Sequence, residues 1–236
     1  MFKIVKLLSD KYGFDYDDAI ELVKSDLYKL EKEELIENPS NLLILCGNEE
    51  TEKENLNYIY NNKPHYLIDK LKPNNKGNIG ENFIYKLCNI CNITNEYNGT
   101  KNKNSDDGTF DILINSKRCE IKTACQGKKG TFQHETLRNE GCDFYIFVSI
   151  CPSYSYITIL PKFNLNENCY YMSSSKDKKQ KFIKPHLRKG ASNVYKFDFS
   201  EKHILQAIQN DHSIKICNDE NNSFDFVKDF FTKKIV

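Results

Sequence analysis

Apolar positions recur at helical spacing in the first third of the chain. Between residues 15 and 30 they fall three or four positions apart, and the acids of residues 15–18 suit an N-cap and a first helical turn. Residues 41–46 read as a short buried segment. The pattern therefore predicts a helical accessory region over residues 1–72.

A different pattern follows residue 73. Residues 79–91 have an apolar stripe that predicts an amphipathic helix, formed by Phe83, Ile84, Leu87, Ile90 and Cys91. Further along we expect two short strands joined by a tight turn, a short helix, and two more strands. The first strand spans residues 109–114, the turn 115–117 and the second strand 118–123. The helix spans 131–140, and the last two strands span 143–150 and 154–160. This α-β-β-α-β-β order predicts an α/β domain over residues 73–236.

The two-strand hairpin holds the residues with candidate chemistry. Strand alternation puts Asp111 on one face of the first strand, and Glu120 and Lys122 together on one face of the second. A short turn places Asp111 opposite Glu120 or Lys122. Two carboxylates at such a point suit Mg²⁺, which takes one or two protein carboxylates and keeps several waters. The ammonium of Lys122 is then placed to orient an attacking water or help deprotonate it.

Spacing alone does not distinguish this hairpin from a surface hairpin with cross-strand salt bridges. An acid two positions before a lysine occurs twice, at Glu120/Lys122 and at Asp177/Lys179. The second pair lies in a polar, serine-rich stretch. Only the first lies in an apolar strand with a further acid, Asp111, nine residues before Glu120.

The order of these residues resembles the PD-(D/E)xK nuclease superfamily, and within it the type II restriction endonucleases. The resemblance covers residues 77–161, and Phe110 stands where the motif has proline. It is carried by Gly80-Glu81, Phe110-Asp111, Glu120-Ile121-Lys122, Gln133 and the strand at 142–148. It implies a restriction-endonuclease-like core, a mixed central sheet flanked by helices, with the N-terminal helical region added.

The resemblance also implies roles for single residues. Asp111 and Glu120 would bind Mg²⁺, or Mn²⁺ in its place, together with the carbonyl oxygen of Ile121, and Lys122 would position the nucleophilic water. Glu81 would complete the site or bind a second metal; alternatively it only complements the helix dipole. Gln133 would contact Lys122 or a phosphate.

Composition sets the protein class. The chain has 236 residues, 39% of them hydrophobic and 28% charged, with nine cysteines and no apolar run of membrane-spanning length. Secreted, membrane-spanning and disordered classes are thereby set aside, and we expect a cytoplasmic protein with reduced core cysteines. Cys88 and Cys91 have no second pair that would complete a zinc site.

The net charge of +1 conceals an uneven distribution. Residues 1–72 hold 10 bases and 15 acids, whereas residues 97–197 hold 17 bases and 9 acids. Residues 176–189 alone contain seven Lys or Arg, either a solubilising loop or a segment that contacts phosphates. The DNA-contacting residues that we expect are Lys128, Lys129, Arg138, Lys178, Lys179, Lys181, Lys184, Arg188 and Lys189.

The sequence thus leads us to expect a Mg²⁺-dependent, sequence-specific endonuclease of double-stranded DNA. We expect a homodimer, with a cognate DNA methyltransferase as a further partner of such a system. Residues 1–72 would serve DNA recognition or dimerisation. Two alternatives stay open: a structure-selective nuclease for Holliday junctions or repair on the same core, and a DNA-binding protein with an inactive core.

Overall fold

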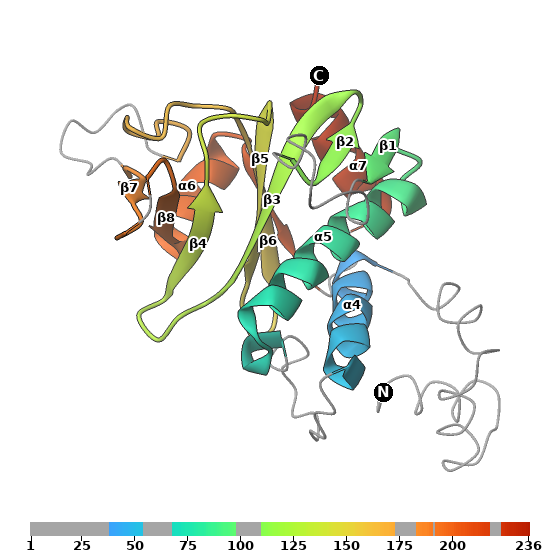
Figure 1. Ribbon diagram of the computed structural model, residues 1–236. Helices are drawn as coiled ribbons and strands as arrows, with labels where there is room; N and C mark the ends of the chain where they lie inside the picture. The colour runs from blue at the N-terminus through green and yellow to red at the C-terminus, as the bar shows by residue number, and fades with distance from the viewer. Residues whose placement is uncertain (1–37, 54–67, 98–109, 173–182, 191, 218–222) are drawn as a thin grey trace, which may run out of the picture.

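The computed structural model describes residues 38–53, 68–97, 110–172, 183–190, 192–217 and 223–236, and the helices and strands are labelled in Figure 1. The helices are α4 (Pro39–Lys53), the 3₁₀ helix η1 (Ile68–Lys70), α5 (Pro73–Ile90), α6 (Glu201–Gln209) and α7 (Phe224–Lys234). The strands are β1 (Asn95–Tyr97), β2 (Ile112–Ile114), β3 (Lys117–Cys125), β4 (Thr131–Leu137), β5 (Phe144–Ile150), β6 (Ser155–Pro161), β7 (His186–Leu187), β8 (Tyr195–Ser200) and β9 (Ser213–Ile216).

A mixed six-stranded sheet forms the centre, in the order β1-β2-β3-β5-β6-β9. Strands β3 and β5 run parallel, and every other neighbouring pair in this sheet is antiparallel. Strand β5 is buried along nearly its whole length, as expected for a strand covered on both faces. The α/β class and the mixed central sheet flanked by helices are confirmed.

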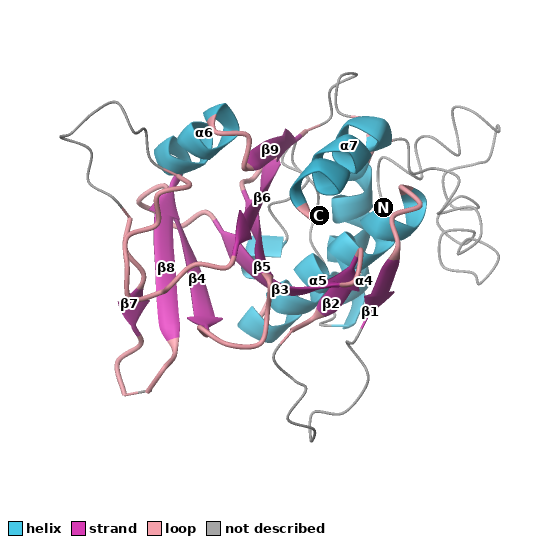
Figure 2. Ribbon diagram, turned by 90° about the horizontal axis from the view of Figure 1, so that it is seen from above, coloured by secondary structure: helices cyan, strands magenta, loops and turns pink. Residues whose placement is uncertain are grey.

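The two faces of this sheet are covered differently, which gives three layers (Figure 2). Helices α4, α5 and α7 pack on one face through a largely aliphatic core that includes Ile79, Ile146 and the ring of Phe83. The other face is covered by α6 and by a second, three-stranded sheet in the order β4-β8-β7. Aromatic side chains such as Phe147 and Phe199 fill the space between the two sheets.

The β2–β3 hairpin forms as the sequence predicts. Asn115 and Ser116 both have positive φ, 49° and 64°, as in the two-residue type I′ turn that suits the twist of paired strands. Ile112 pairs with Cys119 and Ile114 with Lys117. The register therefore brings the residue before β2, Asp111, beside Glu120.

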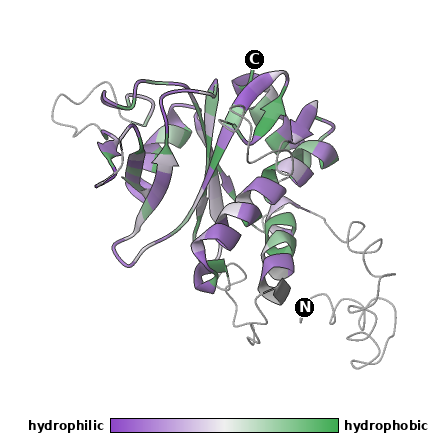
Figure 3. Cartoon of the chain, viewed as in Figure 1, coloured by the Kyte–Doolittle hydropathy of each residue, from purple (hydrophilic) through white to green (hydrophobic). Residues whose placement is uncertain are grey.

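The prediction of a helix over residues 131–140 is wrong, because Thr131–Leu137 forms strand β4. Phe132, His134 and Leu137 are buried, while Thr131 and Gln133 are exposed. Pairing with β8, about sixty residues away in sequence, fixes this strand. The mixed hydrophilic and hydrophobic colouring along β4 and α5 in Figure 3 reflects elements with one face on the core.

Helix α5 begins earlier than expected, at Pro73, which suits the first turn of a helix. Its buried stripe contains Cys88, whereas Ile90 is 39% exposed, contrary to the predicted stripe. Helix α4 brings Leu42, Leu43 and Cys46 into the core beneath α5. The helix expected within residues 15–30 lies outside the described residues.

All nine cysteines are free thiols, and most are buried, as the sequence predicts. Burial raises the pKa of the Cys88 thiol to about 12, so it stays protonated at neutral pH. Among the described residues, no helix has both the length and the apolar character needed to cross a membrane.

Candidate active site

Asp111 is anchored to the edge of β3 by its main chain and its side chain. Its N–H donates to the Cys119 carbonyl at 3.0 Å, and its Oδ2 accepts the Ile121 N–H at 2.6 Å. The backbone of β3 thus fixes where this carboxylate lies. A carboxylate held by a main-chain donor has few orientations left, which suits a group that must act in one geometry.

Glu120 and Lys122 form an ion pair on one face of β3. Ala124, two positions further on, packs in the core between the two sheets, and alternation puts Glu120 and Lys122 on that same face. Their side chains are 16% and 18% exposed. The predicted pairing of these two residues with Asp111 is therefore present in the fold.

Burial and neighbouring charges shift the pKa of all three residues. Burial, with a contribution from Asp111, raises the pKa of Glu120 to about 7 despite the opposing effect of Lys122. Burial likewise raises the pKa of Asp111. Burial alone would lower the pKa of Lys122, but the carboxylates of Glu120 and Asp111 outweigh it and the pKa is raised. Two desolvated carboxylates this close are a favourable place for a cation.

Glu81 reaches the same group from α5, and its charge acts on both Glu120 and Lys122. The Tyr97 hydroxyl of β1 donates to Glu81 Oε2 at 3.1 Å, and the Tyr97 ring stacks on Tyr85 at 4.9 Å between centroids. Tyr97 was not expected from the sequence, because nothing in its neighbourhood marks it as a partner of a residue sixteen positions earlier.

Gly80 lets α5 approach the sheet closely enough for Glu81 to reach this group. A Cβ added at Gly80 would lie 1.8 Å from Thr123 Oγ1, far inside van der Waals contact. The Gly80-Glu81 pair of the sequence motif therefore has a physical basis: the glycine permits close helix–strand packing, and the next residue carries the carboxylate.

These groups open into a cleft of about 1680 Å³ between α5, β3 and the three-stranded sheet. Figure 1 shows α5 and β4 on opposite sides of β3. The α5 and β3 side of the cleft includes Glu81, Asp111 and Lys122. The opposite wall is polar and consists of Thr131, Gln133, Glu135, Thr136, Arg188 and Asp198.

Gln133 lines this cleft, and its side-chain amide donates to Asp198 Oδ2 at 3.2 Å. Arg188 also lines the cleft and is exposed. Lys128 and Lys129 are exposed in the β3–β4 turn, and Arg138, Lys184 and Lys189 are exposed outside the cleft lining. Lys178, Lys179 and Lys181 lie outside the described residues.

The donor set fits Mg²⁺ with its waters more closely than an all-protein metal cage. Within the described ranges, no three or more His, Cys, Asp or Glu side chains are grouped so that they could hold a metal ion. Mg²⁺ needs only one or two protein carboxylates, with water and phosphate oxygens completing six ligands. Asp111, Glu120 and the carbonyl oxygen of Ile121 are hard oxygen donors of this kind.

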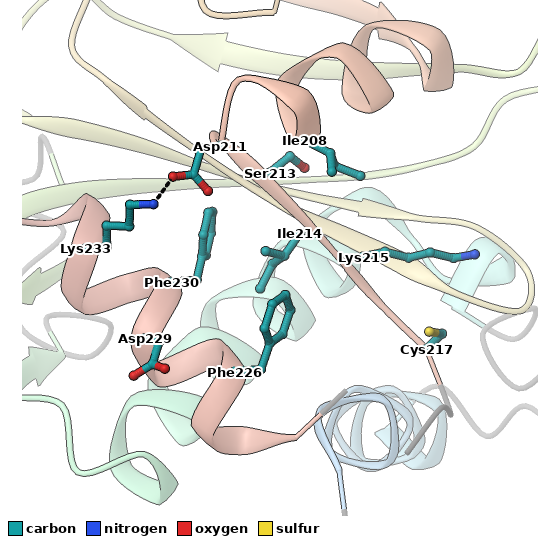
Figure 4. Close-up of a pocket in the computed structure, with 10 residues that line it drawn as sticks. All are labelled: Ile208, Asp211, Ser213, Ile214, Lys215, Cys217, Phe226, Asp229, Phe230 and Lys233. Carbon is teal, nitrogen blue, oxygen red and sulfur yellow. Dashed lines mark ion pairs between the residues drawn. The ribbon is translucent and has the colours of Figure 1, made fainter. Parts of the chain in front are cut away.

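A second hollow, of about 580 Å³, lies between β9, the end of α6 and α7 (Figure 4). Phe226, Phe230 and Ile214 give it an apolar floor, and an ion pair between Asp211 and Lys233 lies at its rim. It shares no lining residue with the carboxylate cleft. We assign no chemistry to it.

Comparison with known proteins gives no family to which the chain can be assigned: no family model, no curated protein and no solved structure matches it.

Proposed function

We propose that this protein is a Mg²⁺-dependent endonuclease of double-stranded DNA, with a PD-(D/E)xK site on a restriction-endonuclease-like core like that of type II restriction enzymes. One observation carries the proposal: the hairpin register places Asp111 beside Glu120, Glu120 pairs with Lys122, and Glu81 of α5 lines the same cleft as Asp111 and Lys122. Three of these four line a polar cleft. The core in question comprises α5, β2, β3, β5 and β6.

Each residue has a distinct role in this proposal. One oxygen of Asp111 accepts the Ile121 N–H, its other oxygen would bind the cation, and Glu120 would supply the second carboxylate. Mg²⁺, when bound, lowers the pKa of a coordinated water and neutralises charge on the phosphate. Lys122 is the only cation that is ion-paired within this group among the described residues, and its ammonium orients the attacking water.

The cleavage assay uses supercoiled plasmid with Mg²⁺. We expect Asp111→Asn and Lys122→Ala each to lower the cleavage rate by at least about a hundredfold, as loss of a single charge-stabilising group commonly does. The matched control is a second acid–lysine pair outside the cleft: Asp211→Asn and Lys233→Ala should cleave at the wild-type rate. Full cleavage by either cleft variant would refute the proposal.

Metal binding has a readout that does not depend on cleavage. A ligand present at about a hundred times its Kd stabilises the folded state by roughly 2.7 kcal/mol, which for a chain of this size is roughly 5–10 °C in Tm. We expect Ca²⁺ or Mg²⁺ to raise the Tm of the wild type, and chelator to reverse the increase. Asp111→Asn should show a much smaller increase, and equal increases in both proteins would place the metal elsewhere.

The same preparations distinguish the two alternatives. A structure-selective nuclease would cut a four-way junction in preference to a linear duplex of the same sequence. A DNA-binding protein with an inactive core would bind duplex DNA in the presence of chelator and nick it with neither Mg²⁺ nor Mn²⁺. We expect cleavage of the linear duplex at defined positions.

A further inference from the structure

The polar side of the three-stranded sheet is organised rather than merely solvated. Two cross-strand pairs of β4 and β8 lie on this face, Thr131 opposite Ser200 and Gln133 opposite Asp198, and the pairs that alternate with them face the core. The Gln133 side chain of β4 donates a hydrogen bond to Asp198 of β8. Further along the same two strands, Lys196 forms an ion pair with Glu135 at 2.5 Å. A regular grid of hydrogen-bonding groups thus covers one sheet face.

This grid forms the wall of the cleft opposite the carboxylates. Thr131, Gln133, Glu135 and Asp198 all line the same space as Asp111 and Lys122. On the reverse side, Phe132, Phe197 and Phe199 pack in the core between the two sheets. A substrate held at the carboxylates would therefore meet this wall.

Gln133 has a defined orientation in the wall. Asp198 only accepts hydrogen bonds when ionised, so the NH₂ end of the Gln133 amide must face it. One N–H of Gln133 is then used, which leaves its second N–H and its carbonyl oxygen for a ligand. This donor–acceptor pair matches adenine, whose N7 accepts and whose N6 amino group donates in the major groove.

Two further observations indicate that the wall is incomplete without a ligand. Asp198 Oδ1 is buried and has no hydrogen-bond partner among the described residues, which is uncommon for a carboxylate oxygen. Arg188 lines the same cleft and is exposed, so its guanidinium is accessible to a ligand there. Arginine beside a glutamine–aspartate pair is a combination suited to reading base edges.

We propose that the polar face of β4-β8-β7 reads base edges in the major groove of DNA, and that Gln133, oriented by Asp198, contacts an adenine. A narrow β-ribbon fits the major groove, where each base pair presents a distinct pattern. The inference rests on the proposed endonuclease function, since it takes duplex DNA as the substrate held at the carboxylates. It makes Gln133 a specificity residue and Asp198 its positioning residue.

The test is a selection from a duplex library with a randomised centre. Wild-type protein with Mg²⁺ cleaves the library and the product ends are sequenced, which yields a preferred site. We expect Gln133→Ala and Asp198→Ala to lose preference at the same A·T position, by about ten- to a hundredfold, while the other positions keep theirs. Gln209→Ala, an exposed glutamine on α6 outside the cleft, should leave the site unchanged.

A second selection measures binding alone, with Lys122→Ala in place of the wild type and the same substitutions added to it. It separates this inference from the proposed function. If the wild type never cleaves but the binding selection still shows a Gln133-dependent A·T position, the endonuclease proposal fails and the inference stands.

Three results would overturn the inference. The first is an unchanged preferred site in both variants. The second is an equal loss of activity on all sequences, and the third is the absence of any preferred site in both selections. Gln133→Thr, which keeps a good strand former at this exposed position, is the second variant if Gln133→Ala is poorly folded.

Discussion

At the scale of single residues, His134 is a buried titratable group on β4, a strand that contributes to the cleft wall. It is fully buried, stacks on Phe199 at 4.8 Å between ring centroids, and lies 3.2 Å from Ser149 Oγ through Nε2. Burial lowers its pKa to about 3. The residue is therefore a neutral part of the core at neutral pH.

This lowered pKa predicts a specific loss of stability in acid. Between its folded value of about 3 and its unfolded value near 6.5, His134 binds a proton only in the unfolded state. Stability therefore rises with pH in this window and falls as pH is lowered through it. Between pH 7 and pH 5 the wild type should lose about 2 kcal/mol more than His134→Gln.

Urea unfolding of both proteins at pH 7 and pH 5 measures this difference in stability. The slope of the unfolding free energy against urea concentration is compared at each pH. The variant serves as the reference for the wild type, because the other histidines titrate in both proteins. Equal losses in wild type and variant would mean that His134 accepts a proton without unfolding the core.

At the scale of elements, the packing of α5 on β3 determines whether Glu81 reaches the carboxylate group. Gly80→Ala would place a methyl group 1.8 Å from Thr123 Oγ1, so the helix or the Thr123 side chain must shift. We expect a loss of about 1–3 kcal/mol in unfolding free energy, as for other overpacked contacts. Adding Thr123→Ala should recover part of this loss, because it removes the hydroxyl that clashes.

The same helix provides the control. An added Cβ at Gly77 meets nothing within 4 Å, so Gly77→Ala should stabilise the protein by up to about 1 kcal/mol through helix propensity. If both alanine variants changed stability alike, close packing at Gly80 would have no special role, and the motif would need another explanation.

Contacts that are close in sequence were predictable, and those far apart were not. Asp111 and Glu120 are nine residues apart across a tight turn, so strand alternation alone placed them together. The helix expected at 131–140 fails because Gln133, Glu135 and Leu137 are good helix formers, whereas β4 depends on pairing with β8. The Gln133–Asp198 bond spans 65 positions, and no local pattern marks it.

At the scale of the whole molecule, charge and symmetry decide how the protein would bind DNA. The +1 total includes an excess of bases in residues 97–197, and the exposed cations Lys128, Lys129 and Arg188 come from this part of the chain. The described residues of one chain contain one group of Asp111, Glu120 and Lys122. In the proposed function, one such group would cut one strand at a time.

Cutting both strands at one site therefore predicts a symmetric pair of chains. The two strands of a palindromic site are related by a twofold axis, and a homodimer with the same axis presents one cleft to each strand. Sedimentation at micromolar concentration should give a mass near twice the 27.6 kDa of the chain.

Mixing the wild type with Lys122→Ala provides a functional test of the dimer. Mixed dimers have one active cleft, so supercoiled plasmid should accumulate as nicked circles in proportion to the variant added. A monomeric enzyme would be affected by the variant only through competition for DNA sites. Its ratio of linear product to nicked circles would be the same with and without the variant. That outcome, with a monomer mass in the presence of DNA, would mean that a single cleft acts on each strand in turn.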